Sequence, residues 1–425
     1  MAETPNLPPA ADDQANTELE DKARFRARRA RARRVLLGAF LFIVVGSVIY
    51  GVWPWLLPAF IYEGPMVQMA GEHEVTLVWY MTRPVSDGLS VQIKDKGGEV
   101  FGVDSSNRRC RAHLTGLDVG QTYAYTISLG QRALAQDALR TNKPAGQPFT
   151  FIAFGDSGKG TESQYLLAAQ MPAINPDFVL HTGDLIYNCG ERFLYRSRFF
   201  RPYRALLSRV NFWPSIGNHD VTEPIDESAY FDVFDLPRNG PPELSPEHNY
   251  WFDYASARIA IVDSELDEAT LGESVAPWLR DVFAKSDALW KFVVFHRPPY
   301  TAGRHGPCEK VQHTLVPVFE QAGVDMVFNG HDHMYERTTP IRDGKPAEDG
   351  RGVVYIVTGA GGARLYDVLP PEKRPAYIAS VHNEIHSLTK VTVTGDELTL
   401  EQIAQGGAML DHWTLHKSPA PAGQP

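Results

Sequence analysis

The chain has 425 residues, of which 43% are hydrophobic and 22% charged, a composition typical of folded domains rather than of disordered chains. Its formal net charge of −10 provides no basic excess for phosphate contacts, which excludes nucleic acid as the expected main partner. The three cysteines are too few for a disulfide scaffold and lack the CxxC spacing of a zinc ribbon.

The first 62 residues combine a polar tail, a basic run and an uncharged apolar stretch. Residues 1–21 are polar and acidic, which predicts disorder, and eight lysines and arginines follow between Lys22 and Arg34. Residues 35–62 contain no charged side chain, and a membrane span needs about 20 apolar residues. A buried core helix of this length would carry a polar face, so the stretch indicates a membrane span instead.

The basic run predicts the orientation of this span. Because positive charge favours the cytoplasmic side, we expect residues 1–34 to be a cytoplasmic tail and residues 35–57 a single transmembrane anchor. The rest of the chain would then be periplasmic or extracellular. A cleaved export signal is the alternative, because Arg33-Arg34 before an apolar run resembles a twin-arginine signal.

Residues 63–146 show short runs of alternating polarity that predict a β-sandwich. In "HEVTLVWYM", Val75 and Leu77 would point to one face of a strand and Thr76 and Val78 to the other. Turn signals such as Gly97-Gly98 separate this run from "LSVQIKD" and "TYAYTISL". The segment "LTGLDVGQTYAYTI" (114–127) is similar to the strand entry of fibronectin type III domains, and this part is expected to act as a spacer.

An α/β domain is predicted after the Pro/Gly linker at 142–148. Five short apolar runs, at 149–154, 176–181, 211–216, 289–295 and 324–329, are expected to be strands. Helical patterns lie between several of them, at 161–173, 198–210, 275–288 and 312–323. Ligand sites in such sheets gather at the carboxyl ends of the strands, so the residues after each run carry the functional prediction.

Side chains that commonly bind metals follow every one of the five runs. They are Asp156 after the first, Asp184 and Tyr187 after the second, Asn218, His219 and Asp220 after the third, His296 after the fourth, and His331 and His333 after the fifth. A Gly-Asp pair alone usually marks a turn, and a lone histidine is usually structural or at the surface. Five such motifs at five predicted strand ends instead predict one shared metal site.

The number of donors indicates two ions rather than one. Two aspartates, an asparagine, a tyrosine and three histidines exceed the needs of one four-coordinate ion, and they fit two ions that share a carboxylate. Two ions about 3.5–4 Å apart can clamp the attacking and leaving oxygens of an in-line displacement.

These motifs, in this order, resemble those of the calcineurin-like metallophosphoesterases and, within them, of the purple acid phosphatases. The resemblance covers residues 64–415, including "VVYIVTGAGG" (353–362) and "LTKVTVTGDELTLEQI" (388–403), which are similar to the family's last strands. It implies an α/β metallophosphoesterase fold of two mixed β-sheets flanked by helices at 147–416, preceded by a fibronectin type III-like β-sandwich at 63–146. Residues 417–425 would form a flexible tail.

The resemblance also implies a role for each motif. Asp156, Tyr187 and His333 would hold one ion and Asn218, His296 and His331 the other, with Asp184 bridging the two. The tyrosine implies Fe³⁺ at the first position, with a divalent Fe, Zn or Mn ion at the second. His219 would contact the substrate and protonate the leaving group, while a metal-bound hydroxide attacks the phosphorus.

Further side chains are candidates for supporting roles. His305 is expected at the rim of the cleft as a substrate contact, with a plain loop histidine as the alternative. Asp220 stands where many purple acid phosphatases have glutamate, and we expect it to orient a histidine. Arg297, Tyr335 and Arg337 are neighbours of ligands in sequence and are expected to support them.

Two of the three cysteines fall in loops that follow metal motifs. Cys189 comes soon after Tyr187, and Cys308 follows His296 by twelve positions. Loops at the same end of a sheet can meet, and the space outside the cytoplasm is oxidising. We therefore expect a Cys189–Cys308 bridge.

The combined prediction is a membrane-anchored enzyme that hydrolyses small phosphate monoesters with two metal ions. A phosphodiesterase with the same metal pair is one alternative. A catalytically inactive, membrane-tethered binding protein is another, but inactive relatives usually lose ligands and all seven positions are filled here. A metal-storage or redox protein would have no need of His219.

Overall fold

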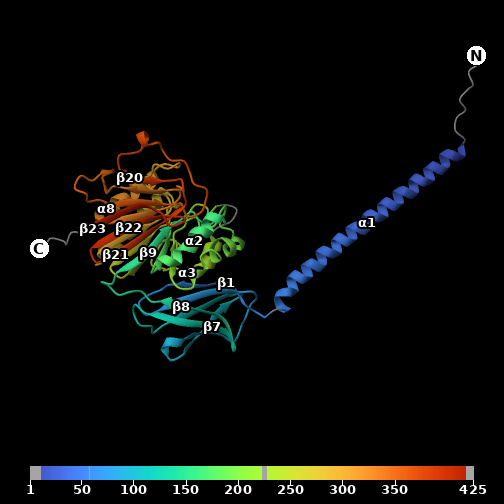
Figure 1. Cartoon of the computed structure of the whole chain (residues 1–425), viewed down its shortest axis with the longest axis horizontal. Coiled ribbons are helices and arrows are strands. Elements are labelled where there is room, and N and C mark those ends of the chain that lie inside the picture. Colours follow the sequence, from blue (N-terminus) through green and yellow to red (C-terminus); the bar gives the residue numbers. More distant parts are fainter. Residues whose placement is uncertain (1–10, 57, 223–226, 418–425) are drawn as a thin grey trace, which may run out of the picture. The chain divides into compact units, whose positions relative to one another are not determined.

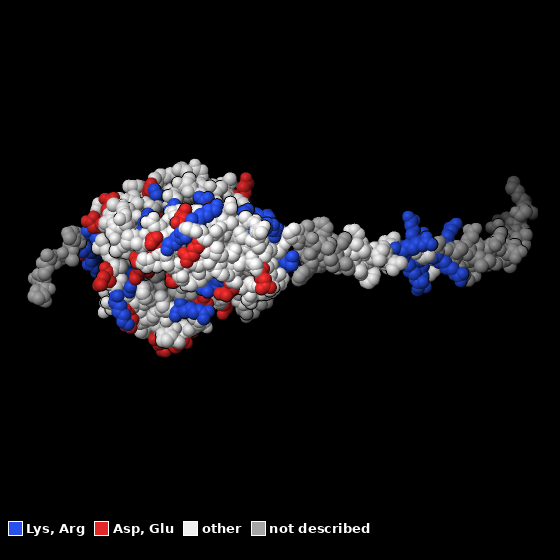
Figure 2. Space-filling view, turned by 90° about the horizontal axis from the view of Figure 1, so that it is seen from below, with Lys and Arg blue, Asp and Glu red and all other residues white. Residues whose placement is uncertain are grey.

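The computed structural model describes residues 11–56, 58–222 and 227–417, and the chain divides into two compact units, Met1–Phe60 and Ile61–Pro425 (Figure 1). The first unit contains the helix α1 (Ala11–Leu56). This helix begins within the segment predicted to be disordered, because the alanines, glutamates and arginines that follow are strong helix formers. Its arginines form one basic band in Figure 2, and exposed apolar side chains such as Leu36 and Phe40 follow them.

The described part of α1 bears on the predicted membrane anchor. Among the helices that the structure describes, none combines the length and the apolar character that crossing a bilayer requires. The predicted anchor, residues 35–57, lies partly outside the described residues, because they omit residue 57 and the side chains of residues 48–56. Residues 1–10 of the predicted tail and residues 418–425 at the other end also lie outside them.

The segment predicted to be a β-sandwich forms two four-stranded antiparallel sheets. One has the strand order β1 (Ile61–Gln68), β2 (Val75–Met81), β6 (Arg109–Leu114) and β5 (Asp104–Ser106). The other has the order β4 (Glu99–Gly102), β3 (Leu89–Ile93), β7 (Thr122–Leu129) and β8 (Arg132–Arg140), with the 3₁₀ turn η1 (Lys94–Lys96) after β3. The fibronectin type III assignment stays a prediction.

Both faces of β2 are buried, although alternating polarity was expected for this segment. Leu77 is fully buried on one face, and Val78 and Tyr80 belong to the large hydrophobic core of the α/β part. The Tyr80 ring lies edge-on to Phe200 of that part, with ring centroids 6.1 Å apart. The sandwich is therefore packed against its neighbour through an apolar face.

The rest of the second unit is built on two mixed sheets, which confirms the predicted α/β metallophosphoesterase architecture. The first has the order β11 (Asn211–Pro214), β10 (Phe178–His181), β9 (Phe149–Phe154), β21 (Ser387–Thr394), β22 (Glu397–Ala404) and β23 (Met409–His416). The second has the order β12 (Tyr250–Tyr254), β13 (Ala257–Ile261), β14 (Trp290–Val294), β15 (Met326–Asn329), β19 (Val354–Thr358), β16 (Tyr335–Thr338) and β20 (Ile378–His382). The hairpin β17 (Ile341–Arg342) and β18 (Lys345–Pro346) stands apart from both.

The inner strands of each sheet are parallel. Their carboxyl ends therefore lie at the same edge of the sheet, and the predicted motifs follow those ends. Strands β11, β10 and β9 run parallel, as do β13, β14, β15 and β19. The two sheets face each other through aromatic side chains: the ring of Phe151 in β9 lies 5.6 Å from those of Phe292 in β14 and Phe328 in β15. Strands buried on both faces require the continuous apolar runs seen in the sequence.

Helices flank the two sheets. On the first, α2 (Glu162–Ile174) contributes Leu167 and Met171 to the shared core, and on the second Phe319 of α8 (Val316–Ala322) stacks on Phe295 at 5.9 Å. Thr161 caps α2 by accepting the Gln164 N–H. The other helical segments are η2 (Arg192–Leu194), η3 (Arg196–Phe200), α3 (Arg204–Leu207), α4 (Ser228–Val233), α5 (Glu268–Thr270), η4 (Leu271–Val275), α6 (Ala276–Ala284), α7 (Glu309–Thr314) and η5 (Pro371–Lys373).

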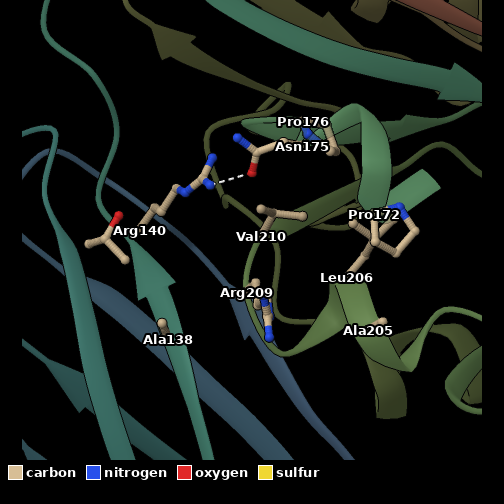
Figure 3. Close-up of a pocket in the computed structure, with 10 residues that line it drawn as sticks. Ala138, Arg140, Pro172, Asn175, Pro176, Ala205, Leu206, Arg209 and Val210 are labelled. Carbon is tan, nitrogen blue, oxygen red and sulfur yellow. Dashed lines mark hydrogen bonds between the residues drawn. The ribbon is translucent and has the colours of Figure 1, made fainter. Parts of the chain in front are cut away.

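Polar contacts complete the seam between the sandwich and the α/β part. A pocket of about 110 Å³ opens between β8 and the segments that hold Pro172 and Leu206, and the Arg140 guanidinium donates to Asn175 across it (Figure 3). At another point of the seam, Arg109 and Arg111 of β6 pair with Asp235, at 2.9 and 2.6 Å. Burial opposes ionisation of Asp235, but the two guanidiniums outweigh it and hold the pKa of that carboxyl below its ordinary value.

Asp235→Asn is expected to lower the free energy of unfolding by about 1 kcal/mol at pH 7, because the carboxylate pairs with two arginines at a partly exposed site. A depressed pKa stabilises the fold above the ordinary carboxyl pKa, and this contribution is lost as the pH falls through the lower folded value. Urea unfolding at pH 7, 5 and 3 should show a lower free energy of unfolding for the variant than for the parent at pH 7 and 5, and a difference that disappears only at pH 3. A difference in the free energy of unfolding that does not change with pH would contradict stabilisation by the ionised Asp235 carboxylate.

Candidate metal centre

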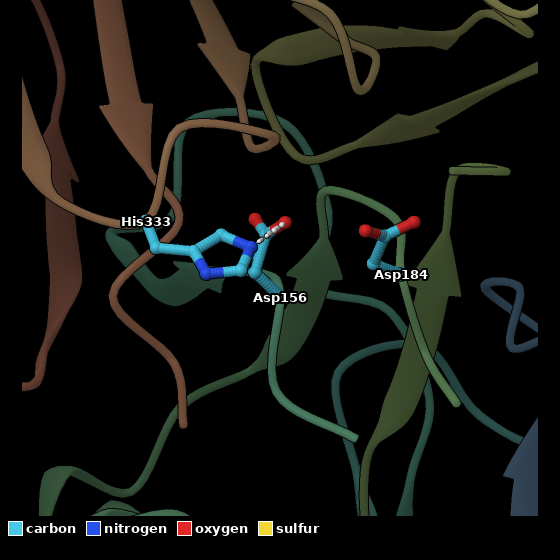
Figure 4. A group of neighbouring side chains, drawn as sticks. All are labelled: Asp156, Asp184 and His333. Atoms are coloured by element: carbon cyan, nitrogen blue, oxygen red, sulfur yellow. Dashed lines mark ion pairs between the residues drawn. The ribbon is translucent and has the colours of Figure 1, made fainter. Parts of the chain in front are cut away.

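The seven predicted ligands come from loops at the carboxyl ends of five parallel strands. Asp156, Asp184 and Asn218 follow β9, β10 and β11 of the first sheet. His296 follows β14 of the second sheet, and His331 and His333 follow β15. Tyr187 lies on the same loop as Asp184. Figure 4 shows Asp156, Asp184 and His333, whose ligand atoms lie within 4.8 Å of one another.

The backbone at this edge is strained and closely packed. Asp156, Asp184 and His331 have φ angles of 54°, 56° and 70°, in the left-handed region that non-glycine residues rarely adopt. A Cβ on Gly330 would stand 2.4 Å from Asp156 Oδ2. A Cβ on Gly217 would stand 2.4 Å from Asp184 Oδ1, so glycine is required at both places for the carboxylates to occupy their positions.

The first group of ligand atoms consists of Asp156, Tyr187 and His333. The Tyr187 hydroxyl lies 3.1 Å from Asp156 Oδ1 and 2.9 Å from His333 Nε2. His333 Nδ1 lies 2.7 Å from the Arg364 carbonyl, so this nitrogen carries the proton and donates it there. The lone pair of His333 Nε2 is thereby turned toward the Asp156 carboxylate, 3.4 Å away.

The second group consists of Asn218, His296 and His331. His296 Nδ1 lies 2.8 Å from the Thr182 carbonyl and donates its proton to it. The Nε2 of the same ring faces Asn218 Oδ1 at 3.1 Å and His331 Nδ1 at 3.2 Å. Asp184 Oδ1 completes the group at 3.4 Å from His296 Nε2.

The arrangement of these ligand atoms is suited to binding cations. In the first group the Asp156 carboxylate and His333 Nε2 converge on the Tyr187 hydroxyl, and in the second the Asp184 carboxylate and the Asn218 amide oxygen converge on His296 Nε2. Such oxygens and nitrogens repel one another unless a proton or a metal ion lies between them. Burial lowers the pKa of His296, yet the Asp184 carboxylate outweighs it and raises that pKa to about 10. The same negative field favours a bound metal ion, and imidazole, carboxylate and phenol oxygen are suitable ligands for one.

Without a metal ion, the surroundings of the Tyr187 hydroxyl keep it in its neutral form. Burial raises its pKa well above the ordinary value, and the charges of Asp156 and Asp184 raise it further. Asp184 itself is buried, and although burial favours its neutral form, His296 and His219 keep its pKa low. The site therefore concentrates negative charge at two carboxylates, and ionisation of the phenol would require a cation beside it.

His219 lies next to the two groups without joining either. Its backbone N–H donates to Asp184 Oδ1 at 2.9 Å, and its Nε2 lies 4.0 Å from Asp184 Oδ2. The ring packs on Tyr187 with centroids 4.4 Å apart, and Nδ1 contacts the Asn188 carbonyl. The side chain remains 31% exposed, so it can reach a molecule that enters the site.

His305 lies at the rim, where the structure also reveals an unpredicted partner, Asp332. The His305 backbone N–H and Nδ1 contact Asp332 Oδ1 at 3.0 and 2.9 Å, and Thr301 Oγ1 donates to Oδ2. The His305 ring stacks on His331 at 4.2 Å. The buried aspartate between the two predicted ligands thus holds the loop that carries His305.

Three further residues contact the candidate ligands or their neighbours, and only Arg297 among them was predicted from the sequence. Arg297 Nη1 lies 3.2 Å from His331 Nε2, as its place in the sequence suggested. Glu265 accepts two bonds from the same guanidinium at 2.8–2.9 Å, a partner that no sequence motif indicates. The Tyr366 ring stacks on His333 at 4.0 Å, and it too was missed, because its position after the glycine-rich turn gives no local signal of that contact.

Three residues that were expected to support the ligands make their side-chain contacts elsewhere. Asp220 accepts the backbone N–H groups of Leu185 and Gly217 at 3.0 Å rather than orienting a histidine, so it fixes the loop that follows β10. Arg337 pairs with Asp411 of β23 at 2.7 Å, because β16 directs it toward that strand and away from the ligand atoms. Tyr335, expected to support a ligand, donates its hydroxyl to the same Asp411.

The predicted Cys189–Cys308 bridge is wrong. All three cysteines are free thiols. The backbone N–H of Cys308 is bonded to the Pro298 carbonyl at the start of α7, and that of Cys189 to Glu191. Each loop is held by its own local contacts, so a common edge of the fold does not by itself bring the two sulfur atoms together.

Comparisons with known proteins agree with this geometry. Residues 149–335 match the model of the family described as calcineurin-like phosphoesterase. Purple acid phosphatase 21 of Arabidopsis thaliana is 30% identical over 230 residues, which cover 52% of this chain and 52% of that protein. Purple acid phosphatase 5 of the same plant is 26% identical over 310 residues, covering 68% and 72%. An uncharacterised protein of Mycobacterium tuberculosis is 24% identical over 307 residues, covering 59% and 57%.

The fold is similar to that of a solved purple acid phosphatase as well. The structure of the yellow lupin (Lupinus luteus) seed enzyme aligns with a TM-score of 0.69 and 19% identity over 84% of this chain and 74% of that one. The chain spans little more than half the length of the first curated relatives it matches. Residues 149–335 therefore match the calcineurin-like phosphoesterase family, and the chain is similar to purple acid phosphatases in sequence and in fold.

Proposed function

We propose that this protein hydrolyses phosphate monoesters with two metal ions held by the seven candidate ligands. The observation that carries the proposal is the arrangement of the two groups of ligand atoms on either side of the buried Asp184 carboxylate. When bound, such ions neutralise phosphate charge and lower the pKa of a coordinated water. The purple acid phosphatase relatives support the same reaction class.

The chain's own residues would orient and protonate the substrate. His219 is partly exposed beside Asp184 and fits a proton donor to the departing alkoxide. Arg297, fixed by Glu265, holds His331 from the outside. His305, fixed by Asp332, stands where an incoming phosphate ester would pass.

Metal analysis combined with a substrate panel tests the proposal. The full chain, purified after growth with iron, zinc and manganese, should retain about two ions per molecule and hydrolyse aryl and alkyl phosphate monoesters. Turnover confined to diesters would assign it as a phosphodiesterase. A protein that binds no metal and cleaves neither class would contradict the proposal and leave a tethered binding protein as the better explanation.

We propose that Tyr187 binds Fe³⁺ at the first position, with a divalent ion at the second. The Tyr187 hydroxyl is buried between Asp156 and His333, and a tyrosinate–Fe³⁺ pair absorbs visible light. Tyr187→Phe is therefore expected to lose the visible band of the iron-loaded protein and to lower metal affinity about 10- to 100-fold. Phe231→Leu, a change in a different segment, should leave the spectrum unaltered. A coloured Tyr187→Phe protein would exclude tyrosinate as the source of the band.

We propose that residues 35–57 anchor the chain in a membrane with the hydrolase outside. The support is the uncharged stretch at 35–62 and the eight basic residues directly before it. The full chain should sediment with membranes, resist alkaline extraction, and lose its large unit to protease added from outside. A soluble product that begins after residue 57 would instead establish a cleaved export signal.

A further inference from the structure

Arg304 lies at the rim of the candidate metal centre and has no acidic partner in the described part of the chain. It lies in the loop between β14 and α7, its side chain is exposed, and no ion pair joins it to any residue that the structure describes. Its guanidinium lies over the Tyr366 ring, 5.3 Å from the centroid. A cation–aromatic contact of this kind holds a guanidinium in place while leaving its charge available to a ligand.

Tyr366 connects Arg304 directly to the metal ligands. Its ring stacks on His333 at 4.0 Å with an angle of 13° between the planes, and meets His305 edge-on at 5.3 Å. The backbone of Tyr366 is held at both of its polar groups. Its N–H donates to the His333 carbonyl, and its carbonyl accepts from Asn383 Nδ2. A single immobile ring therefore separates the guanidinium from a candidate ligand.

The loop that carries Arg304 is equally well fixed. Gly303 donates its N–H to Thr301 Oγ1, and His305 is held through both its backbone and its ring by Asp332. A Cβ on Gly303 would stand 2.2 Å from Asp332 Oδ2, which shows how closely the loop packs there. Arg304 is thus positioned by its two neighbours as well as by the ring beneath it.

Two other cations beside the candidate ligands, Arg297 and Lys159, are already engaged by the protein. Arg297 is paired with Glu265 through bonds of 2.8–2.9 Å, so its charge is largely compensated. Lys159 lies over the Tyr187 ring and donates to Asn188 Oδ1 at 2.6 Å. Of these three cations, Arg304 alone has no hydrogen bond from its guanidinium to an oxygen of the described residues.

From this arrangement we infer that Arg304 binds a second anionic group on the leaving side of the substrate. This inference rests on the proposed function, since it places the phosphoryl group at the metal ligands and the leaving group toward the rim. The substrate class is then a phosphomonoester whose leaving group carries a carboxylate or a further phosphate. A guanidinium is suited to both, because its planar fork can donate two parallel bonds to either anion.

Two inert phosphonates that differ by one carboxylate provide the test. The dissociation constants of benzylphosphonate and 4-(phosphonomethyl)benzoate are measured by calorimetry on the full metal-loaded chain and on Arg304→Gln, Arg304→Lys and Arg280→Gln. Arg280 is an exposed arginine of α6, outside the loops of the site, and serves as the matched control. The readout is the ratio of the two constants for each protein, which needs no turnover.

The parent protein and Arg280→Gln should bind the carboxylated compound about fivefold more tightly than the plain one, as one partly exposed charge pair provides. Arg304→Gln should bring the ratio to one, Arg304→Lys should keep part of it, and the ratio should shrink in high salt. An equal ratio in the parent and Arg304→Gln, or no binding of either compound, overturns the inference. An Arg304-dependent ratio in a protein that hydrolyses nothing would instead overturn the proposed function alone.

Discussion

Replacing Asp184 with alanine should abolish turnover and release both metal ions. Its carboxylate lies 3.4 Å from His296 Nε2, accepts the His219 backbone N–H at 2.9 Å, and stands within 4.8 Å of ligand atoms of Asp156 and His333. Its carboxylate therefore lies near ligand atoms of both groups. We expect kcat/KM to fall at least about 10³-fold and metal content to fall with it, because a bridging ligand serves both ions.

Asp325→Ala is the matched control for this variant. Asp325 is also a buried aspartate beside the second sheet, but it lies at the amino end of β15 and pairs with Lys417 at 2.7 Å. Its loss should lower thermal stability and leave metal content and turnover unchanged. Metal analysis, steady-state kinetics and melting curves of the two variants separate loss of the site from loss of the fold. An active, metal-loaded Asp184→Ala protein would contradict the bridging role.

Replacing His219 with alanine should lower kcat while the metal ions stay bound. The ring contributes to neither group of ligand atoms, but it lies beside Asp184 with almost a third of its side chain exposed. Loss of a general acid typically costs about 10²–10⁴-fold. The cost depends on the leaving group, because an alkoxide needs a proton as it departs, whereas a 4-nitrophenolate does not.

A comparison of leaving groups therefore tests the role of His219. His219→Ala should lose about 10²-fold more activity toward an alkyl phosphate than toward 4-nitrophenyl phosphate. His313→Ala, which removes an exposed histidine that pairs with Glu268 on the surface, should behave like the parent with both substrates. An equal loss with both leaving groups would show that His219 positions the substrate or the loop and does not transfer a proton.

The polar residues at the strand ends were readable because each belongs to a local pattern. The run at 149–154 coincides with β9, and the other four runs contain β10, β11, β14 and β15. A parallel strand buried on both faces must be apolar along its length, so its end is visible as the point where polar residues begin. That rule placed Asp156, Asp184 and His296 correctly at one edge of the fold.

Contacts between distant segments could not be read in this way. β9 pairs with β21, more than 230 residues later, and the hairpin β12–β13 at the edge of the second sheet has no motif that marks it. Arg337 was expected beside the ligands, but the strand order β19–β16–β20 and the neighbouring Asp411 decide its position.

By itself, the sequence determined the class of fold, the kinds of ligand atom and the strand ends at which they lie, since these follow from apolar runs and from side-chain chemistry. The tertiary structure alone decided which groups face one another: Asp184 toward His296, Asp332 toward His305, Glu265 toward Arg297 and Tyr366 between His333 and Arg304. The physical reason is that such contacts depend on how two sheets pack and where their loops meet, and no local pattern of residues encodes that distance.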